Sequence, residues 1–274
     1  MSNLVKRVLT SIVLVLMIST AVLLSSYTFL ALLLVVNCIG LYEFYRLFSA
    51  HSVSPAWVQG IILSLSLLLS SFFVIAGKIP AQYLLVNIPL YFLIFVSELY
   101  SRAEQPFQNI AITLLGVMFV TLALCFFAAV GFISKEHSQY HPHMIMGCFL
   151  ILWASDSGAY LFGKRFGKHK LFERISPNKT WEGSIAGAVC ALLVSYIVSL
   201  FAVEADVIGW LFISIIITIA GTYGDLVKSL MKRSLGVKDA GNILPGHGGI
   251  LDRFDSLLGS AAFVYLFLVL YQHA

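Results

Sequence analysis

Four aspartates in the second half of the sequence stand in or beside long apolar segments. Asp156 and Asp225 lie one to two helical turns before the C-terminal ends of two such segments, and Asp252 and Asp255 lie at the start of the last one. Acidic side chains at such places are costly in a membrane and are usually functional. Asp252 and Asp255 share a face because they are three residues apart. If the three segments pack together, the four carboxylates converge at one depth.

Carboxylates gathered beside lysine and arginine are poor proton carriers, because the positive charges keep them ionised. They suit a hard divalent cation such as Mg²⁺, which binds one or two carboxylates together with substrate phosphates. The alternative is structural: Asp252 and Asp255 stabilise a helix N-terminus and pair with Arg253 and Lys232. The presence of Asp225 in the same set favours the metal site.

A glycine-rich stretch, residues 244–250, comes directly before the last acidic pair. Gly248 and Gly249 let the backbone approach a ligand closely and direct N–H groups at phosphate oxygens. The helix N-terminus that follows is itself an anion site. The alternative is a plain glycine turn, but the basic residues nearby favour a phosphate site. His247 is open to two interpretations, a general acid or phosphate hydrogen-bond donor, and a structural histidine.

A second polar stretch, residues 176–182, reads SPNKTWE. Ser176, which precedes a proline, and Thr180 both have the character of helix caps. Asn178 and Lys179 have the chemistry to hold a phosphate or a sugar. A capped and solvated loop is the alternative, and the stretch alone does not decide between them.

The elements that must position these residues are membrane helices. Of the 274 residues, 59% are hydrophobic and 11% are charged, whereas soluble domains carry about 25% charged residues. A spanning helix needs about 20 mostly apolar residues. We therefore predict an all-α, polytopic membrane protein. Its spanning segments, about nine in number, are residues 8–25, 28–48, 57–76, 80–99, 110–133, 145–163, 183–203, 207–230 and 254–272.

The distribution of positive charge predicts the orientation. With the N-terminus in the cytoplasm, all of the 17 Lys and Arg residues except Lys78 and Lys135 fall on the cytoplasmic side or at inner helix ends. Lys and Arg are retained on that side, so we predict a cytoplasmic N-terminus and an external C-terminus. The two large inner loops, residues 164–182 and 231–253, then face the cytoplasm.

These loops predict a division of the chain. Residues 1–133 have short loops and read as a transmembrane scaffold for dimer or lipid contact, and residues 134–274 read as the catalytic region. Glu43 and Glu98 in the scaffold are expected to pair with Arg46 and Arg102 rather than to act in catalysis. The four cysteines lie in apolar runs without metal-binding or redox spacing, and we assign them no role.

The run of residues 229–255, SLMKRSLGVKDAGNILPGHGGILDRFD, resembles the signature of the phosphatidate cytidylyltransferases, also called CDP-diacylglycerol synthases. The signature covers about a tenth of the chain, and its length and unusual composition make it specific. The polytopic character of the chain and the SPNKTWE loop upstream are similar to the same family.

The resemblance implies transfer of CMP from CTP to phosphatidic acid, giving CDP-diacylglycerol and pyrophosphate, with Mg²⁺ as cofactor. It implies an all-helical, homodimeric fold, and it allows a potassium ion beside the magnesium. It assigns Asp225 and Asp252 as metal ligands with Asp255 close by. We therefore predict catalytic residues Asp225, Lys232, Arg233, Lys238, Asp239, His247, Asp252, Arg253 and Asp255. We predict substrate-binding residues Ser176, Asn178, Lys179, Gly248 and Gly249.

Two other functions fit parts of the sequence. A CTP-dependent membrane lipid kinase is the closer alternative, and it would release CDP instead of pyrophosphate. A transporter usually carries its charged site near the bilayer midplane within inverted repeats, whereas these charges gather at one face without a clear repeat. No nucleic-acid partner is expected. We predict a multi-pass protein of the bacterial inner membrane with its active site toward the cytoplasm.

Overall fold

The computed structural model describes residues 3–49, 53–133, 139–237, 241 and 248–272. Almost every described element is a helix, which confirms the predicted all-α class. In chain order the helices are α1 (Asn3–Leu24), α2 (Ser26–Ser49), α3 (Trp57–Ile75), η1 (Ala81–Val86), α4 (Asn87–Tyr100), α5 (Pro106–Gly116), η2 (Val117–Leu122), α6 (Ala123–Val130), α7 (Pro142–Phe166), α8 (Trp181–Ser199), α9 (Val207–Ser234) and α10 (Asp255–Gln272).

Each predicted apolar segment corresponds to one helical rod, which is either a single helix or a continuous run of helices such as η1 with α4 and α5 with η2 and α6. Within the described residues, eight of these rods are long and apolar enough to cross a membrane, and the apolar part of α1, Thr10–Leu24, is shorter. The polytopic character is therefore confirmed, while the count of nine crossings stays a prediction. The first two rods separate at Ser25, where the Ser25 N–H donates to Thr28 Oγ1 at 3.0 Å and the Thr28 N–H donates to Ser25 Oγ at 3.1 Å.

The loop of residues 164–182 contains the one sheet of the described chain, a short antiparallel hairpin. Its strands are β1 (Lys170–Phe172) and β2 (Ser176–Thr180). Ser176 lies in β2 opposite Phe172, so its predicted role as a helix cap is wrong. Thr180 does cap α8, because its side chain accepts the Gly183 N–H at 3.2 Å.

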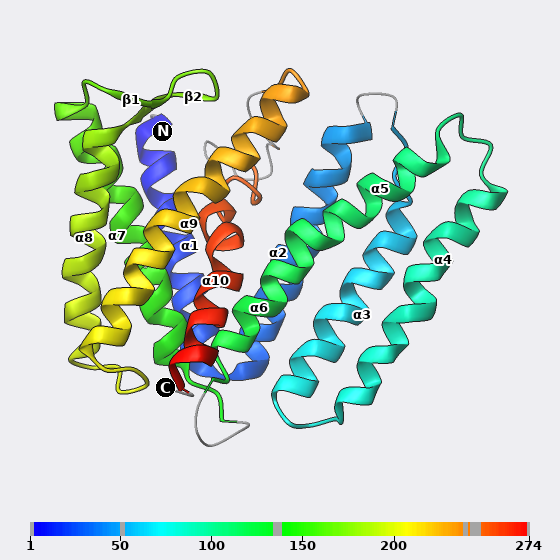
Figure 1. Ribbon diagram of the computed structural model, residues 1–274, viewed down its shortest axis with the longest axis horizontal. Coiled ribbons are helices and arrows are strands. Elements are labelled where there is room, and N and C mark those ends of the chain that lie inside the picture. The colour runs from blue at the N-terminus through cyan, green and yellow to red at the C-terminus, as the bar shows by residue number, and fades with distance from the viewer. Residues whose placement is uncertain (1–2, 50–52, 134–138, 238–240, 242–247, 273–274) are drawn as a thin grey trace.

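The hairpin lies at one end of the helical bundle (Figure 1). The first turn of α1 lies at the same end, together with the C-terminal ends of α7 and α9. Helix α10 ends at the opposite end of the bundle. An odd number of crossings requires the first helix to begin and the last helix to end at opposite ends of the bundle, as they do here. The orientation in the membrane stays a prediction.

Glycines bring the helices of the second half into close contact. On α8, Gly183 and Gly187 are four residues apart, and a Cβ atom at position 187 would lie 2.7 Å from the Ser155 carbonyl oxygen on α7. On α9, a Cβ atom at Gly224 would lie 2.6 Å from the Cα atom of Gly259 on α10. Small residues let membrane helices approach in this way. The acidic residues beside these glycines are thereby drawn together.

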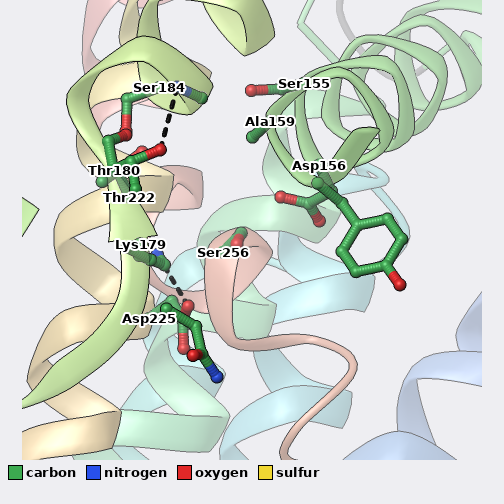
Figure 2. Close-up of a pocket in the computed structure, with 12 residues that line it drawn as sticks. Ser155, Asp156, Ala159, Lys179, Thr180, Ser184, Thr222, Asp225 and Ser256 are labelled. Atoms are coloured by element: carbon green, nitrogen blue, oxygen red, sulfur yellow. Dashed lines mark hydrogen bonds and ion pairs between the residues drawn. The ribbon is translucent and has the colours of Figure 1, made fainter. Parts of the chain in front are cut away.

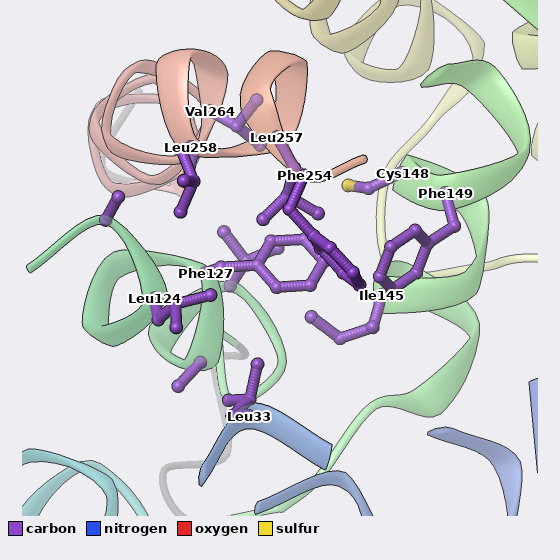
Figure 3. Packing of buried hydrophobic residues seen from close by; sticks show 14 of the residues in the cluster. Leu33, Leu124, Phe127, Ile145, Cys148, Phe149, Phe254, Leu257, Leu258 and Val264 are labelled. Atoms are coloured by element: carbon purple, nitrogen blue, oxygen red, sulfur yellow. The ribbon is translucent and has the colours of Figure 1, made fainter. Parts of the chain in front are cut away.

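The hydrophobic core joins the two halves of the chain. Leu33 on α2 and Phe127 on α6 pack toward Phe149 on α7 and toward Phe254, which directly precedes α10 (Figure 3). The rings of Phe127 and Phe149 meet edge to face at 5.2 Å, and those of Phe149 and Phe254 at 6.5 Å, a favoured arrangement of aromatic pairs. This packing fixes the start of α10, where the acidic pair lies.

Candidate active site

A polar cavity of about 230 Å³ opens between the hairpin, α7, α8, α9 and α10. Figure 2 shows its walls, with Asp156 on one side and Lys179 and Asp225 on another. Hydroxyl groups complete the lining, among them those of Ser184 and Thr222. The cavity combines both charges with neutral hydrogen-bonding groups, which suits a phosphorylated polar ligand.

A chain of alternating charges runs from this cavity to the start of α10. Lys179 Nζ lies 2.7 Å from Asp225 Oδ2, and the carboxyl group of Asp225 lies beside that of Asp255. Lys228 is paired with Asp255 and lies 2.9 Å from Asp252 Oδ1. The structure thus brings together Asp225, Asp252 and Asp255, three of the four aspartates that were predicted to converge. The fourth, Asp156, lies across the polar cavity from Asp225.

Lys232 ends this chain, with its Nζ 2.8 Å from Asp252 Oδ1. Two ammonium groups therefore share one Asp252 oxygen. Burial of the Asp252 carboxyl acts to raise its pKa, but Lys228 and Lys232 outweigh burial and lower the pKa to about 2. Asp252 is consequently ionised throughout the neutral pH range.

Lys228 is a site residue that the sequence analysis did not single out. Only 1% of its surface is exposed, although it lies on the apolar helix α9. A buried lysine needs a charged partner, and Lys228 has two in Asp252 and Asp255. The signal was present in its spacing, three residues after Asp225 and four before Lys232, which places all three on one helix face.

The acidic residues of the site have the chemistry of Mg²⁺ ligands. No three His, Cys, Asp or Glu side chains of the described residues form a ready metal-ligand set. The donor chemistry nevertheless fits, because Asp225 and Asp255 are in direct contact and Asp252 shares Lys228 with Asp255. Adjacent carboxylates are the oxygen donors that Mg²⁺ prefers. The lysines balance their charge in this arrangement.

The described part of the glycine-rich loop lies against both Asp252 and Glu43. Gly248 has a positive φ of 81°, and the Gly249 N–H donates to Asp252 Oδ2 at 3.3 Å. Glu43 accepts the N–H groups of Ile250 at 3.0 Å and Leu251 at 2.8 Å.

The two predicted partners of the scaffold glutamates are not observed. No ion pair within the described chain joins Glu43 to Arg46 or Glu98 to Arg102. Glu98 instead accepts hydrogen bonds from Ser101 Oγ at 2.8 Å and Asn109 Nδ2 at 3.2 Å. Glu43 therefore accepts from neutral donors at both oxygens, and Glu98 accepts from two neutral donors at Oε2.

A second cavity, of about 340 Å³, lies on another side of Asp156. Its walls combine the apolar residues Leu14 and Val15 of α1 with polar and charged residues that include Thr10 and Arg253. Asp156 lines both cavities. An apolar wall beside a cationic group suits an amphipathic ligand with an anionic head.

The remaining predicted site residues fall in three places. Asn178 lines the polar cavity. Arg233 lies outside the charge chain and donates to the carbonyl oxygens of Ile175 at 3.4 Å and Val237 at 3.2 Å. Ser176 is in strand β2 and lines neither cavity. Three predicted residues lie outside the described part of the chain: Lys238, Asp239 and His247.

Comparison with known proteins identifies the family of this chain. Residues 5–271 match the model of the cytidylyltransferase family. The chain is 37% identical over 255 residues to the phosphatidate cytidylyltransferase of Staphylococcus haemolyticus, covering 92% of this chain and 94% of that protein. It is 34% identical over 278 residues to the Bacillus subtilis protein of the same name, covering 99% of this chain and 100% of that protein. The chain therefore belongs to the cytidylyltransferase family.

Proposed function

We propose that this protein is a phosphatidate cytidylyltransferase, which transfers CMP from CTP to phosphatidic acid and releases pyrophosphate. The observation that carries the proposal is the full-length similarity to relatives of that name. The carboxylate–lysine chain and the two cavities that meet at Asp156 support it. The product is CDP-diacylglycerol, so the protein acts in phospholipid biosynthesis.

The two cavities suggest separate places for the two substrates. The polar cavity, with Asn178 and Lys179, takes CTP. The second cavity takes phosphatidic acid, with its phosphate toward Arg253 and its acyl chains along the apolar wall of α1. Asp156 then lies between the two phosphates that react.

The reaction needs little proton transfer. A phosphate monoester has a second pKa near 6, so the lipid phosphate is already a nucleophile at neutral pH. One of its oxygens forms a bond to the α-phosphorus of CTP, and the bond from that phosphorus to the β-phosphate oxygen breaks. Lysine side chains such as Lys179 and Lys232 neutralise the nucleotide, and the protein contributes mainly position and charge.

Asp225, Asp252 and Asp255 would hold Mg²⁺, with K⁺ beside it. When bound, Mg²⁺ supplies charge neutralisation of the leaving pyrophosphate. Lys228 and Lys232 balance the negative charge of Asp252 and Asp255 at this place. Dependence of turnover on Mg²⁺, its loss in EDTA, and a comparison of KCl with NaCl test these assignments.

The cellular setting follows from the substrates and the relatives. The relatives are bacterial, so we place the protein in the cell (inner) membrane with its site toward the cytoplasm, where CTP is available. We also propose a homodimer, which light scattering on the detergent-solubilised protein tests by mass.

The deciding experiment is turnover by purified protein in mixed micelles with phosphatidic acid, α-labelled CTP and Mg²⁺. Label that moves into lipid, accompanied by release of pyrophosphate, supports the proposal. Label that stays in water as CDP indicates a CTP-dependent lipid kinase instead. CTP that remains intact with several lipids contradicts both.

A further inference from the structure

Glu43 is an acidic residue of the N-terminal half that reaches the proposed active site. It lies on α2, is 1% exposed and makes both of its described hydrogen bonds with residues more than 200 positions away. Oε1 accepts the Ile250 N–H at 3.0 Å, and Oε2 accepts the Leu251 N–H at 2.8 Å. One carboxylate therefore holds two successive backbone amides.

The backbone around Glu43 has no room for other side chains. A Cβ atom at Gly241 would lie 2.6 Å from Glu43 Oε1, and a Cβ atom at Gly249 would lie 2.6 Å from Oε2. Real Cβ atoms essentially never come within 3.0 Å of a non-bonded atom. Glycine at these two positions thus lets the chain pass on both sides of the carboxylate.

The amides that Glu43 holds stand directly before Asp252. The turn continues with the Arg253 N–H, which donates to the Ile250 carbonyl oxygen at 2.9 Å. The Gly249 N–H meanwhile donates to Asp252 Oδ2 at 3.3 Å. Asp252 thus projects from a turn whose backbone is fixed at Ile250 and Leu251 by Glu43.

We propose that Glu43 is a positioning residue of the active site, which fixes the backbone of residues 249–252 and so aims the Asp252 carboxylate at the bound metal ion. This inference rests on the proposed function, in which Asp252 binds Mg²⁺. Glu43 touches neither substrate and acts through the loop. Residues that orient metal ligands in this way typically change metal affinity or activity by about 10–100-fold when replaced.

The test compares Glu43→Gln with the wild type. The amide keeps the size of the side chain but offers one acceptor oxygen for two N–H groups. In metal-free protein, hydrogen exchange followed by mass spectrometry should show about tenfold or more faster exchange at Ile250 and Leu251. The Mg²⁺ concentration that half-maximally raises the melting temperature, and that supports half-maximal turnover, should increase about 10–100-fold.

Glu98→Gln is the matched control. Glu98 is also a buried glutamate of the N-terminal half, 9% exposed, but it hydrogen bonds only to Ser101 and Asn109 among the described residues. It should leave exchange at residues 250–251 and the Mg²⁺ requirement unchanged. Should Glu43→Gln not fold, Gly241→Ala serves instead, because its methyl group pushes the loop from Glu43 and should give the same two changes.

Three results would overturn the proposal. One is an unchanged rate of exchange at residues 250–251 in a folded Glu43→Gln protein. Another is faster exchange with an unchanged Mg²⁺ requirement, which would make Glu43 structural only. The third is a wild type that Mg²⁺ does not stabilise, since Asp252 would then bind no metal. A wild type that Mg²⁺ stabilises but that transfers no CMP would count against the proposed function alone.

Discussion

Lys179 and Asp225 form an ion pair of 2.7 Å that joins the hairpin to α9. Asp225 in turn contacts Asp255 at the start of α10. The hairpin, which lies outside the helical bundle, is therefore connected by one lysine to the acidic residues of the site. Any ligand that competes for Lys179 would change the charge balance of Asp225.

Replacing Asp225 or Asp252 with Asn should reduce CMP transfer by about 100-fold or more, because loss of a charged ligand removes several kcal/mol of transition-state stabilisation. The proteins should still elute as folded species in detergent. Labelled lipid formed per minute in mixed micelles is the measurement. Cys38→Ala, at a position with no assigned role, is the control that should retain activity. Near-normal turnover in either Asn variant would refute the metal assignment.

Lys179→Ala should raise the KM for CTP by about tenfold, which corresponds to about 1.4 kcal/mol of lost binding. The reason is the loss of a cation from the wall of the polar cavity. Lys170→Ala is a matched control on the same hairpin, because Lys170 donates to the Pro177 carbonyl oxygen at 2.7 Å and does not line that cavity. Initial rates over a range of CTP concentrations give the KM of each variant. Equal KM values for the two variants would argue against a nucleotide site at Lys179.

Lys228→Met should lower the free energy of unfolding by about 3–5 kcal/mol, because it leaves two partly buried carboxylates without their shared cation. Denaturant unfolding in detergent, followed by tryptophan fluorescence, measures the change. Lys164→Met removes an exposed lysine from the end of α7 and should have little effect. A stable Lys228→Met protein would mean that Lys232 alone balances the acidic residues.

Gly224→Ala should destabilise the protein by about 1–3 kcal/mol through overpacking, because its methyl group would collide with the backbone of Gly259. Gly221→Ala, one turn earlier on α9, meets its nearest atoms at 3.2 Å and should cost less. Thermal unfolding of both variants gives the ranking. The reverse order would show that α9 and α10 can move apart at Gly224.

The effect of Asp252 on stability should depend on pH only under acidic conditions. Its pKa of about 2 in the folded protein lies below the unfolded value of about 3.9. The stabilisation is therefore complete above about pH 4 to 5 and is lost as the pH falls through 2. The melting temperatures of wild type and Asp252→Asn should differ by a constant amount from pH 5 to 8 and converge below pH 4. A gap that already narrows between pH 7 and 5 would contradict the lowered pKa.

Much of the fold and part of the site could be predicted because lipid imposes simple rules. The lengths of the apolar segments predicted the membrane helices. The positions of Asp225 and Asp255 near the same ends of their segments predicted that the two carboxyl groups lie close together. The hairpin was not predicted, because strands of three and five residues show no usable alternation, and Ser176 before proline reads as a cap. Glu43 was set aside because nothing local points to partners 207 and 208 residues away.

The contact between Glu43 and the last loop also has a consequence for biosynthesis. The ribosome completes α2 long before it adds Ile250 and Leu251, so the carboxylate enters the membrane before its two donors exist. A buried carboxylate without such donors is unfavourable. The nascent chain therefore gains this pair of contacts only when translation nears its end, and a product truncated before residue 250 lacks both donors to the Glu43 carboxylate.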